Sequence, residues 1–245
     1  RVGDTTLRPW RIAVFDIYTG KGWLEALAET QKDVHLPEII PAGRKALSQH
    51  FTLAGSAGGK LFAAAEPVRL LSEGLNATVL PGGDSFLVTG DLLEYDLVSY
   101  VPDVTIELLR ASGGEIDPQI LETYLQLPSN LPDRVRKLAQ KLTNEDMSYY
   151  EKVILVQNYV RNSVPYDLHT QPPAPDQDVV DYFLFEAKSG FCTYYASAMA
   201  VLLRLEGIPA RVATGYAPGT YIKEQGSFLI SGDSAHAWVE VYFLD

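Results

Sequence analysis

A single cysteine at the start of an apolar segment constrains this chain more than any other feature. Residues 191–206 have the apolar period of an α-helix, and Gly207 and Pro209 after them are expected to end it. Cys192, the only cysteine in 245 residues, would then lie in the first helical turn. At that position the positive end of the helix dipole and the unpaired N–H groups stabilise a thiolate.

A glycine stands two residues before the cysteine. We expect Gly190 to turn the chain sharply and to let a substrate approach the backbone closely. The N–H groups of the helical turn that follows are also suited to bind the oxyanion of a tetrahedral intermediate. The Gly-x-Cys pattern therefore predicts an activated thiol at a helix N-terminus.

A histidine opens a predicted strand 44 residues after the cysteine. Residues 235–243 alternate as a β-strand does, with one apolar side and a second side that begins with His236. If the fold brings the two residues together, His236 can hold the proton of Cys192 as an ion pair and favour the nucleophilic thiolate. The two motifs together predict a Cys–His pair for acyl transfer.

Each of these residues also has a structural interpretation. A lone Cys in an apolar helix is often an inert, buried side chain, and a His beside a Trp is often packed against its neighbours or exposed at the surface. We favour catalysis because the two motifs occur in one chain. No metal site is predicted, since the one Cys and the scattered His35, His50, His169 and His236 offer no ligand cluster. A thiol mechanism needs no cofactor, and none is predicted.

The pattern of the chain changes near residue 118. Short strand-like segments between Gly and Pro breaks predict a β-rich, sandwich-like module over residues 1–118. Residues 119–130 are predicted to be a linker, and 131–245 a second domain. There, apolar residues at helical spacing predict two helices that flank the Cys192 helix. The fold class is therefore expected to be α+β.

The composition excludes some partners. Lys and Arg number 20 and Asp and Glu 31, which gives a net charge of −11. Such a balance disfavours nucleic acid and anionic membrane surfaces as partners. No apolar run approaches the ~20 residues that a membrane span needs. A single cysteine forms no internal disulfide, so the redox compartment is not indicated.

Three stretches of the sequence together resemble the transglutaminase-like superfamily. They are GFCTYYASAM at 190–199, LEGIPARVATGY at 205–216 and HAWVEV at 236–241. The resemblance is closest to the bacterial membrane-anchored branch, the transglutaminase protein A type. The extracytoplasmic region of that branch is also similar to PWRIAVFD at 9–16, YTGKGW at 18–23 and YLQLP at 124–128.

The resemblance implies a papain-like core with helices packed on an antiparallel sheet. It also implies an extracytoplasmic region, periplasmic or at the cell surface, of a protein anchored by membrane segments outside residues 1–245. In that superfamily a Cys–His–Asp triad performs acyl transfer. The resemblance places the nucleophile on Cys192 and the general base on His236. Tyr166 and Trp238 are candidates to shape the substrate slot or stabilise the oxyanion, while core or rim packing is an equal expectation for both.

The acidic member of that triad departs from the family pattern. In the family it lies on the strand after the His strand. Asp245 ends the His strand itself, and Asp233 is expected in the Gly232-Asp233 turn. We therefore expect the third member beyond residue 245. A chain without it is expected to be weakly active, because the imidazole lacks the partner that fixes its tautomer.

Three functions follow as hypotheses. In the first, Cys192 forms a thioester from a protein or peptide amide in the cell envelope, and an amine or water then accepts the acyl group. The sequence leaves transamidation and hydrolysis both open. In the second, the chain is a non-catalytic envelope module that binds or assembles peptides in the same cleft. In the third, the β-rich half carries an interaction role and any chemistry is subordinate.

Overall fold

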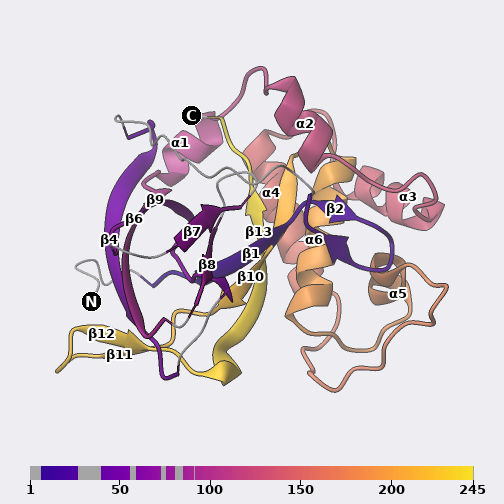
Figure 1. Cartoon of the computed structure of the whole chain (residues 1–245). Coiled ribbons are helices and arrows are strands. Elements are labelled where there is room, and N and C mark those ends of the chain that lie inside the picture. The colour runs from indigo at the N-terminus through magenta and orange to yellow at the C-terminus, as the bar shows by residue number, and fades with distance from the viewer. Residues whose placement is uncertain are drawn as a thin grey trace. The chain divides into compact units, whose positions relative to one another are not determined.

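Helices and antiparallel sheets make up the fold, which confirms the predicted α+β class (Figure 1). The computed structural model describes residues 7–26, 40–55, 59–72, 76–80, 85–90 and 92–244. They group into two compact units, each assembled from separate stretches of chain. Unit 1 comprises the described residues of Arg1–Val14, Leu27–Val104 and Thr214–His236. Unit 2 comprises those of Phe15–Ala26, Thr105–Ala213 and Ala237–Asp245.

Unit 1 contains two antiparallel sheets of three strands each among its described residues. The first has the order β4-β9-β6, and its strands are β4 (Arg44–Thr52), β9 (Glu94–Pro102) and β6 (Glu66–Leu70). The second has the order β5-β8-β7, with β5 (Gly59–Lys60), β8 (Phe86–Thr89) and β7 (Asn76–Val79). A hairpin of β11 (Thr220–Ile222) and β12 (Ser227–Leu229) completes the unit. These short strands between turns agree with the strand-like segments predicted within residues 1–118.

The longest strand of unit 1 outside β9 escaped the sequence analysis. Along β4, Leu47 and Gln49 are buried while Ser48 and His50 are exposed. Gln49 therefore places an amide on the core face, where Nε2 donates to Ser99 Oγ at 2.8 Å and Oε1 accepts from a backbone N–H at 2.7 Å. The amide is satisfied inside the protein, so its burial is tolerated. A polar residue on the inner face obscures the period-two pattern.

The core of unit 1 is formed by two hydrophobic clusters. One lies around the β5-β8-β7 sheet and contains Leu61, Ala63, Val79, Phe86, Val88, Leu92, Tyr95 and Leu97. The other contains Trp10, Leu47, Ala64 and Val101. Phe51 packs against both clusters and stacks on Tyr95 with ring centroids 4.9 Å apart. Trp10 is 4% exposed and anchored by a hydrogen bond from Nε1 to the carbonyl oxygen of Pro218.

Unit 2 is organised around one central helix, α6 (Cys192–Leu205), which contacts α3, α4 and α5. The helices of the unit are α1 (Ile106–Ala111), α2 (Pro118–Tyr124), α3 (Asp133–Leu142), α4 (Tyr149–Arg161), α5 (Val179–Phe185) and α6. The helical periods predicted α3, α4 and α6, and the structure confirms these three. The two helices predicted to flank the Cys192 helix, α3 and α4, do contact it.

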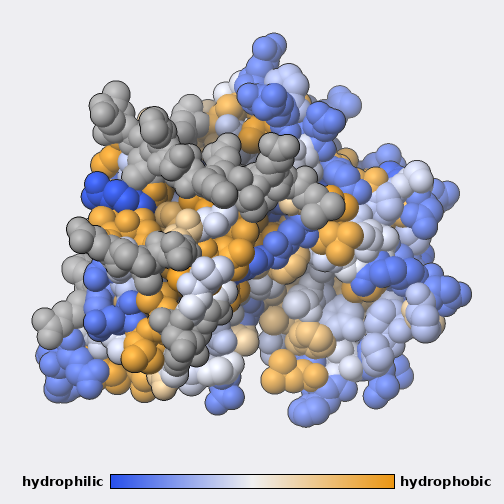
Figure 2. Space-filling model, in the orientation of Figure 1, coloured by the Kyte–Doolittle hydropathy of each residue, from blue (hydrophilic) through white to orange (hydrophobic). Residues whose placement is uncertain are grey.

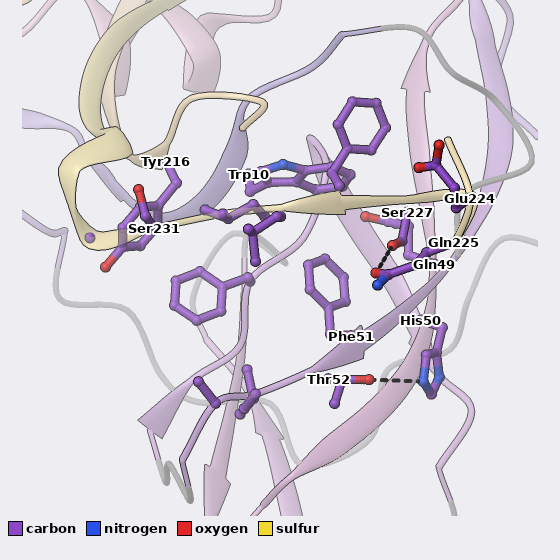
Figure 3. Close-up of a pocket in the computed structure, with 17 residues that line it drawn as sticks. Trp10, Gln49, His50, Phe51, Thr52, Tyr216, Glu224, Gln225, Ser227 and Ser231 are labelled. Atoms are coloured by element: carbon purple, nitrogen blue, oxygen red, sulfur yellow. Dashed lines mark hydrogen bonds between the residues drawn. The ribbon is translucent and has the colours of Figure 1, made fainter. Parts of the chain in front are cut away.

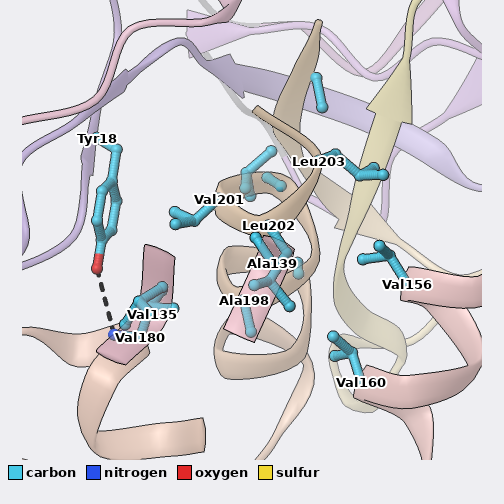
Figure 4. Packing of buried hydrophobic residues seen from close by; sticks show 14 of the residues in the cluster. Tyr18, Val135, Ala139, Val156, Val160, Val180, Ala198, Val201, Leu202 and Leu203 are labelled. Atoms are coloured by element: carbon cyan, nitrogen blue, oxygen red, sulfur yellow. Dashed lines mark hydrogen bonds between the residues drawn. The ribbon is translucent and has the colours of Figure 1, made fainter. Parts of the chain in front are cut away.

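The apolar face of α6 lies in the core of unit 2 (Figure 4). Ala198, Val201, Leu202 and Leu203 have no exposed surface. Val135 and Ala139 from α3, and Val156 and Val160 from α4, belong to the same cluster. Burying an aliphatic side chain of this size contributes about 1.5–3 kcal/mol. Packing of this kind fixes the position of α6, and with it the position of the residue at its start.

Side chains define the start of two helices in unit 2. Ser148 and Glu151 form a reciprocal capping box at α4, in which each side chain accepts a backbone N–H of the other residue. Asp178 caps α5 by accepting from the N–H groups of Val180 and Asp181. The Val180 N–H also donates to the Tyr18 hydroxyl oxygen, the contact drawn as a dashed line in Figure 4. These bonds satisfy amides that an α-helix leaves without a partner.

A third antiparallel element contains β1 (Trp10–Phe15), β10 (Ala210–Tyr216) and β13 (Ala235–Val241), in the order β1-β10-β13. β13 confirms the strand predicted at residue 235. In unit 1, Gly215 lies so close to β1 that a Cβ atom there would stand 1.9 Å from the carbonyl oxygen of Trp10. Only glycine fits at position 215, because any side chain would meet the backbone of β1.

In unit 2, Arg211 Nε donates to Glu240 Oε2 at 2.9 Å.

A hairpin near the start of unit 2 turns at residues 19–22. It joins β2 (Ile17–Tyr18) to β3 (Trp23–Leu24), and the Thr19 N–H donates to the carbonyl oxygen of Gly22. Gly20 has a φ of +84° in this turn, a conformation that glycine adopts at little cost. The hairpin places Trp23 against the core of unit 2.

The surface of unit 2 is hydrophilic over α3 and α5 on the face drawn in Figure 2. The exposed side of α3 carries Asp133, Arg134 and Lys137.

None of the helices in the part of the chain that the structure describes has the length and apolarity to cross a membrane.

Candidate active site

Cys192 is the first residue of α6, as the sequence predicted. Phe191 occupies the N-cap position with extended backbone, and no side chain caps the helix there. The first amides of the helix therefore keep hydrogen-bonding capacity for another group. Cys192 is partly buried and packs against the hydrophobic cluster of unit 2, so one side of its thiol faces apolar atoms.

Gly190 packs tightly against α5. It is buried and has no positive φ, and a Cβ atom at this position would lie 2.6 Å from Cε2 of Phe183. The close neighbour on the Cβ side is therefore a ring of α5, and the approach of a substrate to the backbone of Gly190 stays a prediction. The Gly190 N–H donates to the Pro165 carbonyl at 3.1 Å, and its own carbonyl accepts from the Asp167 N–H at 2.8 Å.

These two hydrogen bonds form a parallel bridge between Tyr166 and Gly190. The bridge holds the loop at 164–167 beside the start of α6. The Tyr166 ring stacks on Tyr195 at a centroid distance of 6.0 Å, and the Tyr195 hydroxyl donates to the Val164 carbonyl oxygen at 2.5 Å. The position of Tyr166 is thus fixed by backbone and ring contacts on both sides.

The structure brings Tyr166 and Cys192 together. Tyr166 and Cys192 lie close enough for electrostatic and hydrogen-bond interactions with Cys192 to shift the pKa of the Tyr166 phenol. Desolvation raises the pKa of Tyr166, and the negative charge of a Cys192 thiolate raises it further. The phenol therefore keeps its proton at neutral pH and remains a hydrogen-bond donor. A phenol and a helix N–H beside one sulfur atom are suited to stabilise negative charge there.

His236 is the second residue of β13 and is exposed. The next residue, Ala237, is 4% exposed and belongs to the hydrophobic cluster that Cys192 packs against. Trp238 is half-buried and, by strand alternation, points to the same side of β13 as His236. The pairing of Cys192 with His236, and the role of Trp238, stay predictions.

The acidic partner is not identified in the described part of the chain. Asp233 is exposed in a short 3₁₀ turn (Gly232–Ser234) before β13, as the sequence predicted for a turn residue. Asp245 lies outside the described residues. Across the ranges described above, no three His, Cys, Asp or Glu side chains are grouped so that they could hold a metal ion.

Trp23 and Arg204, two residues whose roles the sequence analysis missed, hold α6 in place. Trp23 Nε1 donates to Ser197 Oγ at 3.0 Å, and Ser197 donates in turn to the carbonyl oxygen of Thr193. Arg204, at the far end of the helix, is 3% exposed, and its guanidinium lies 4.8 Å from the centre of the Trp23 ring. Burial lowers the pKa of Arg204 to about 10. The run Lys21-Gly22-Trp23 was noted in the sequence, but nothing in it indicated this contact.

Arg204 is held by carbonyl groups as well as by the ring. Its Nε donates to the carbonyl oxygen of Ala210 at 2.8 Å, and one terminal nitrogen donates to that of Gln126 at 2.7 Å. Hydrogen bonds to a buried cation offset part of the cost of removing it from water. The arginine thereby joins α6 to the start of β10 and to the segment after α2.

Comparisons with known proteins show which family and which solved structures the chain resembles. Residues 136–245 match the family model of the transglutaminase-like superfamily. The crystal structure of the periplasmic domain of TgpA from Pseudomonas aeruginosa bound to ethylmercury superposes with a TM-score of 0.71 and 27% identity, covering 100% of this chain and 87% of that one. A second crystal structure of the same periplasmic domain gives 0.71 and 26%.

Two curated relatives extend the comparison. YebA of Bacillus subtilis, named an uncharacterized protein, is 31% identical over 259 residues, or 96% of this chain and 35% of that protein. A protein-glutamine gamma-glutamyltransferase of Pseudomonas aeruginosa is 41% identical over 137 residues, or 56% of this chain and 20% of that protein. The chain thus spans about a third or less of the length of these relatives. With the helix-start cysteine, the family match and the structural likeness in agreement, residues 136–245 carry a transglutaminase-like domain, and the chain resembles the TgpA type.

Proposed function

We propose that this chain performs thiol-dependent acyl transfer on protein or peptide amides, with Cys192 as the nucleophile and His236 as the general base. The observation that carries the proposal is that Cys192 opens α6 with Tyr166 beside it, on a loop held by the parallel bridge to Gly190. The match of residues 136–245 to the transglutaminase-like superfamily supports a cysteine-dependent reaction.

The first half of the reaction forms a thioester. His236 takes the thiol proton, and the Cys192 sulfur attacks the carbonyl carbon of the amide. The oxygen of the tetrahedral intermediate becomes negative and accepts hydrogen bonds from the Cys192 N–H and the Tyr166 hydroxyl. As the C–N bond breaks, His236 returns its proton to the leaving nitrogen, which departs as ammonia or an amine.

The second half decides the product. Attack of a primary amine on the thioester gives a new amide and frees the thiol, which is transamidation. Attack of water gives a carboxylic acid, which is deamidation or proteolysis. The name of the Pseudomonas aeruginosa relative, protein-glutamine gamma-glutamyltransferase, supports transfer from a glutamine side chain. We propose transamidation on that ground, with hydrolysis as the competing outcome.

The remaining parts of the proposal concern the surroundings of the reaction. Residues 131–245 are proposed as the catalytic domain, an assignment that the family match at 136–245 supports. Trp238 is proposed as one wall of the substrate slot, because it shares a strand side with His236. The likeness to a periplasmic domain supports an extracytoplasmic region of a membrane-anchored protein, acting on proteins or peptides of the cell envelope.

A specific observation also favours the non-catalytic alternative. Tyr166 is 57% exposed and Leu168 is 67% exposed, so apolar side chains lie at the surface in the loop beside Cys192. Such a surface can hold a peptide without any chemistry. An envelope module that binds or assembles peptides therefore stays the competing function.

The pH dependence of alkylation at Cys192 separates the two. The chain has one thiol, so the label reports Cys192 alone. We expect fast alkylation to persist well below the ordinary thiol pKa of about 8.5. In His236→Ala the rate should follow an ordinary thiol. His169→Ala is the matched control, because the His169 side chain is 95% exposed and should leave the profile unchanged. An ordinary thiol profile in the parent chain would favour the binding module.

An activity assay then tests the product. A glutamine-containing protein and a fluorescent primary amine are supplied together, and amine incorporation and ammonia release are both measured. Transamidation gives the two in equal amounts, whereas hydrolysis gives ammonia alone. Neither product, from a chain whose thiol is activated, would contradict the assignment of glutamine as the acyl donor.

A further inference from the structure

Unit 1 contains a pocket of about 800 Å³ whose lining includes none of the residues assigned to the reaction. Its lining comes from Trp10 on β1, from β4, from Phe62 and Tyr216, and from the segment that includes β12 (Figure 3). All of these residues belong to unit 1. The volume is within the range of about 300–1,000 Å³ typical of ligand sites.

The way in which strands border the pocket indicates the shape of its ligand. Consecutive residues 49–54 line one side, and consecutive residues 227–232 line the other. Successive side chains of a strand point to opposite faces, so a pocket on one face would be lined by alternate residues. Consecutive lining residues mean that the pocket follows the strands along their edges. Among the described strands, β4 stands at the end of its sheet and β12 pairs with β11 alone. An extended peptide is the ligand that fits between two such strands.

The aromatic content of the pocket indicates which side chain that peptide carries. Five rings contribute to the lining: Trp10, Phe51, Phe62, Tyr216 and Phe228. They contact one another, since Trp10 lies 5.5 Å from Phe51 and 6.0 Å from Phe228 between ring centroids. Ring faces attract organic cations, and the attraction grows when water is excluded.

The charges of the pocket also indicate a cationic ligand. Glu224 contributes a carboxylate from the turn between β11 and β12, and the described lining residues include neither Lys nor Arg. Lys223 lies in the same turn but is not part of the lining. His50 Nδ1 is paired with Asp96 Oδ1 at 2.9 Å, so a protonated imidazole would be neutralised by that carboxylate. Gln49 is occupied by Ser99 and the Ala64 N–H. The carboxylate of Glu224 is therefore the charge that a ligand meets.

We propose that this pocket binds an extended peptide segment through a basic side chain, whose apolar stem packs among the aromatic rings and whose charged end pairs with Glu224. The backbone of the peptide runs between the edges of β4 and β12. The site is a binding site and involves no bond making. It lies in unit 1 and does not require the reaction proposed for Cys192.

Binding is measured with Cys192→Ala in the full chain, so that turnover plays no part. The probes are three unstructured peptides that differ at one central residue: lysine, Nε-acetyl-lysine and norleucine. Isothermal titration gives the affinities. We expect the lysine peptide to bind about 2- to 30-fold more tightly than the other two, the range for a charge–ring contact of about 0.5–2 kcal/mol. Equal affinity for all three would overturn the proposal.

Two substitutions locate the site. Glu224→Gln should weaken binding of the lysine peptide alone, and Phe228→Leu should weaken it because the ring face is removed while an apolar side chain remains. Glu115→Gln is the matched control, because Glu115 is exposed and lies in unit 2, and its substitution removes the same charge as Glu224→Gln. Circular dichroism confirms that each variant is folded. Unchanged affinity in both folded pocket variants, or equal loss in Glu115→Gln, would show that the peptide binds elsewhere or by net charge only.

Failure here and failure of the proposed function are distinguishable. Cys192 alkylation and amine incorporation report the thiol, and the titrations report the pocket. An active enzyme whose pocket ignores the lysine peptide would overturn only the inference about unit 1. An inert thiol with a functional pocket would overturn only the assignment of the reaction.

Discussion

Trp23 Nε1 and Ser197 Oγ are joined by a hydrogen bond of 3.0 Å, and the same hydroxyl donates to the carbonyl oxygen of Thr193 at 2.6 Å. Thr193 directly follows Cys192. The β2–β3 hairpin is therefore connected through one serine to the first turn of the helix that carries the proposed nucleophile. This contact joins residues 174 apart in sequence.

Replacing Ser197 by Ala should lower stability by about 1–3 kcal/mol, because the Trp23 N–H loses its partner in a mostly buried position. Urea unfolding measures the change. The control is Ser48→Ala, since Ser48 is exposed on β4. An equal effect of the two substitutions would show that the link to Trp23 contributes nothing.

Replacing Cys192 by Ala should abolish amine incorporation while leaving the fold almost unchanged, because the small side chain is only partly buried. Turnover and melting temperature are measured on the same sample. Cys192→Ser, which replaces the thiol with a hydroxyl of similar size, should be inactive or nearly so. Turnover retained in the alanine variant would remove Cys192 as the nucleophile.

Replacing Tyr166 by Phe should reduce kcat by about 10- to 1,000-fold, since one donor to the oxyanion is lost. Stability should change little, because the ring is 57% exposed and its stacking on Tyr195 is kept. Tyr182→Phe is a suitable control: it also loses one hydroxyl, which donates to the Gln171 carbonyl oxygen in the same unit. If both variants lose the same fraction of kcat, Tyr166 acts on the structure and not on the reaction.

The stability of the protein should fall in alkali because of Tyr18. Burial, followed by the charge of Asp178, raises the pKa of Tyr18 above its ordinary value of 10.0. Above about pH 10 the unfolded chain loses this proton while the folded chain keeps it, so the unfolded state binds fewer protons and stability decreases as pH rises. The contribution is fully present below pH 10 and declines by about 1.4 kcal/mol per pH unit above it.

The experiment compares the unfolding free energy of the parent chain and of Tyr18→Phe between pH 8 and 11. The phenylalanine variant should be less stable at pH 8, because the Tyr18 hydroxyl bonds to Asp178 and to the Val180 N–H. Its curve should nevertheless decline less steeply above pH 10. Tyr221→Phe, with an exposed ring, is the control and should keep the parent slope. Parallel curves for the parent and Tyr18→Phe would contradict the prediction.

Much of the fold follows from local patterns in the sequence. The helical period and the Gly207-Ile208-Pro209 ending define α6, and the alternation after residue 235 defines β13. By contrast, α5 begins with two β-branched residues and consists mostly of apolar side chains, a composition that does not distinguish helix from strand. Its helical form depends on Asp178, whose side chain caps the first turn.

In the candidate site, too, some features follow from local sequence and others depend on contacts between distant residues. Cys192 and its place in the helix follow from the residues around it. The contact with Tyr166 depends on a parallel bridge to Gly190, a pairing between distant residues that no local period reports. Arg204 was overlooked because an arginine near the end of a helix is usually a solvated side chain, whereas here a tryptophan ring and two carbonyl groups accept it.

The parallel bridge at Gly190 has a consequence for the behaviour of the protein on warming. Backbone bonds on both sides of this glycine tie the loop of Tyr166 to the residue two positions before Cys192. The phenol and the sulfur should therefore move as one piece during thermal fluctuations, and their separation should stay constant until the unit itself unfolds. We therefore expect the upper temperature limit of the proposed reaction to be set by melting of the core around α6 rather than by gradual loosening of the Tyr166 loop.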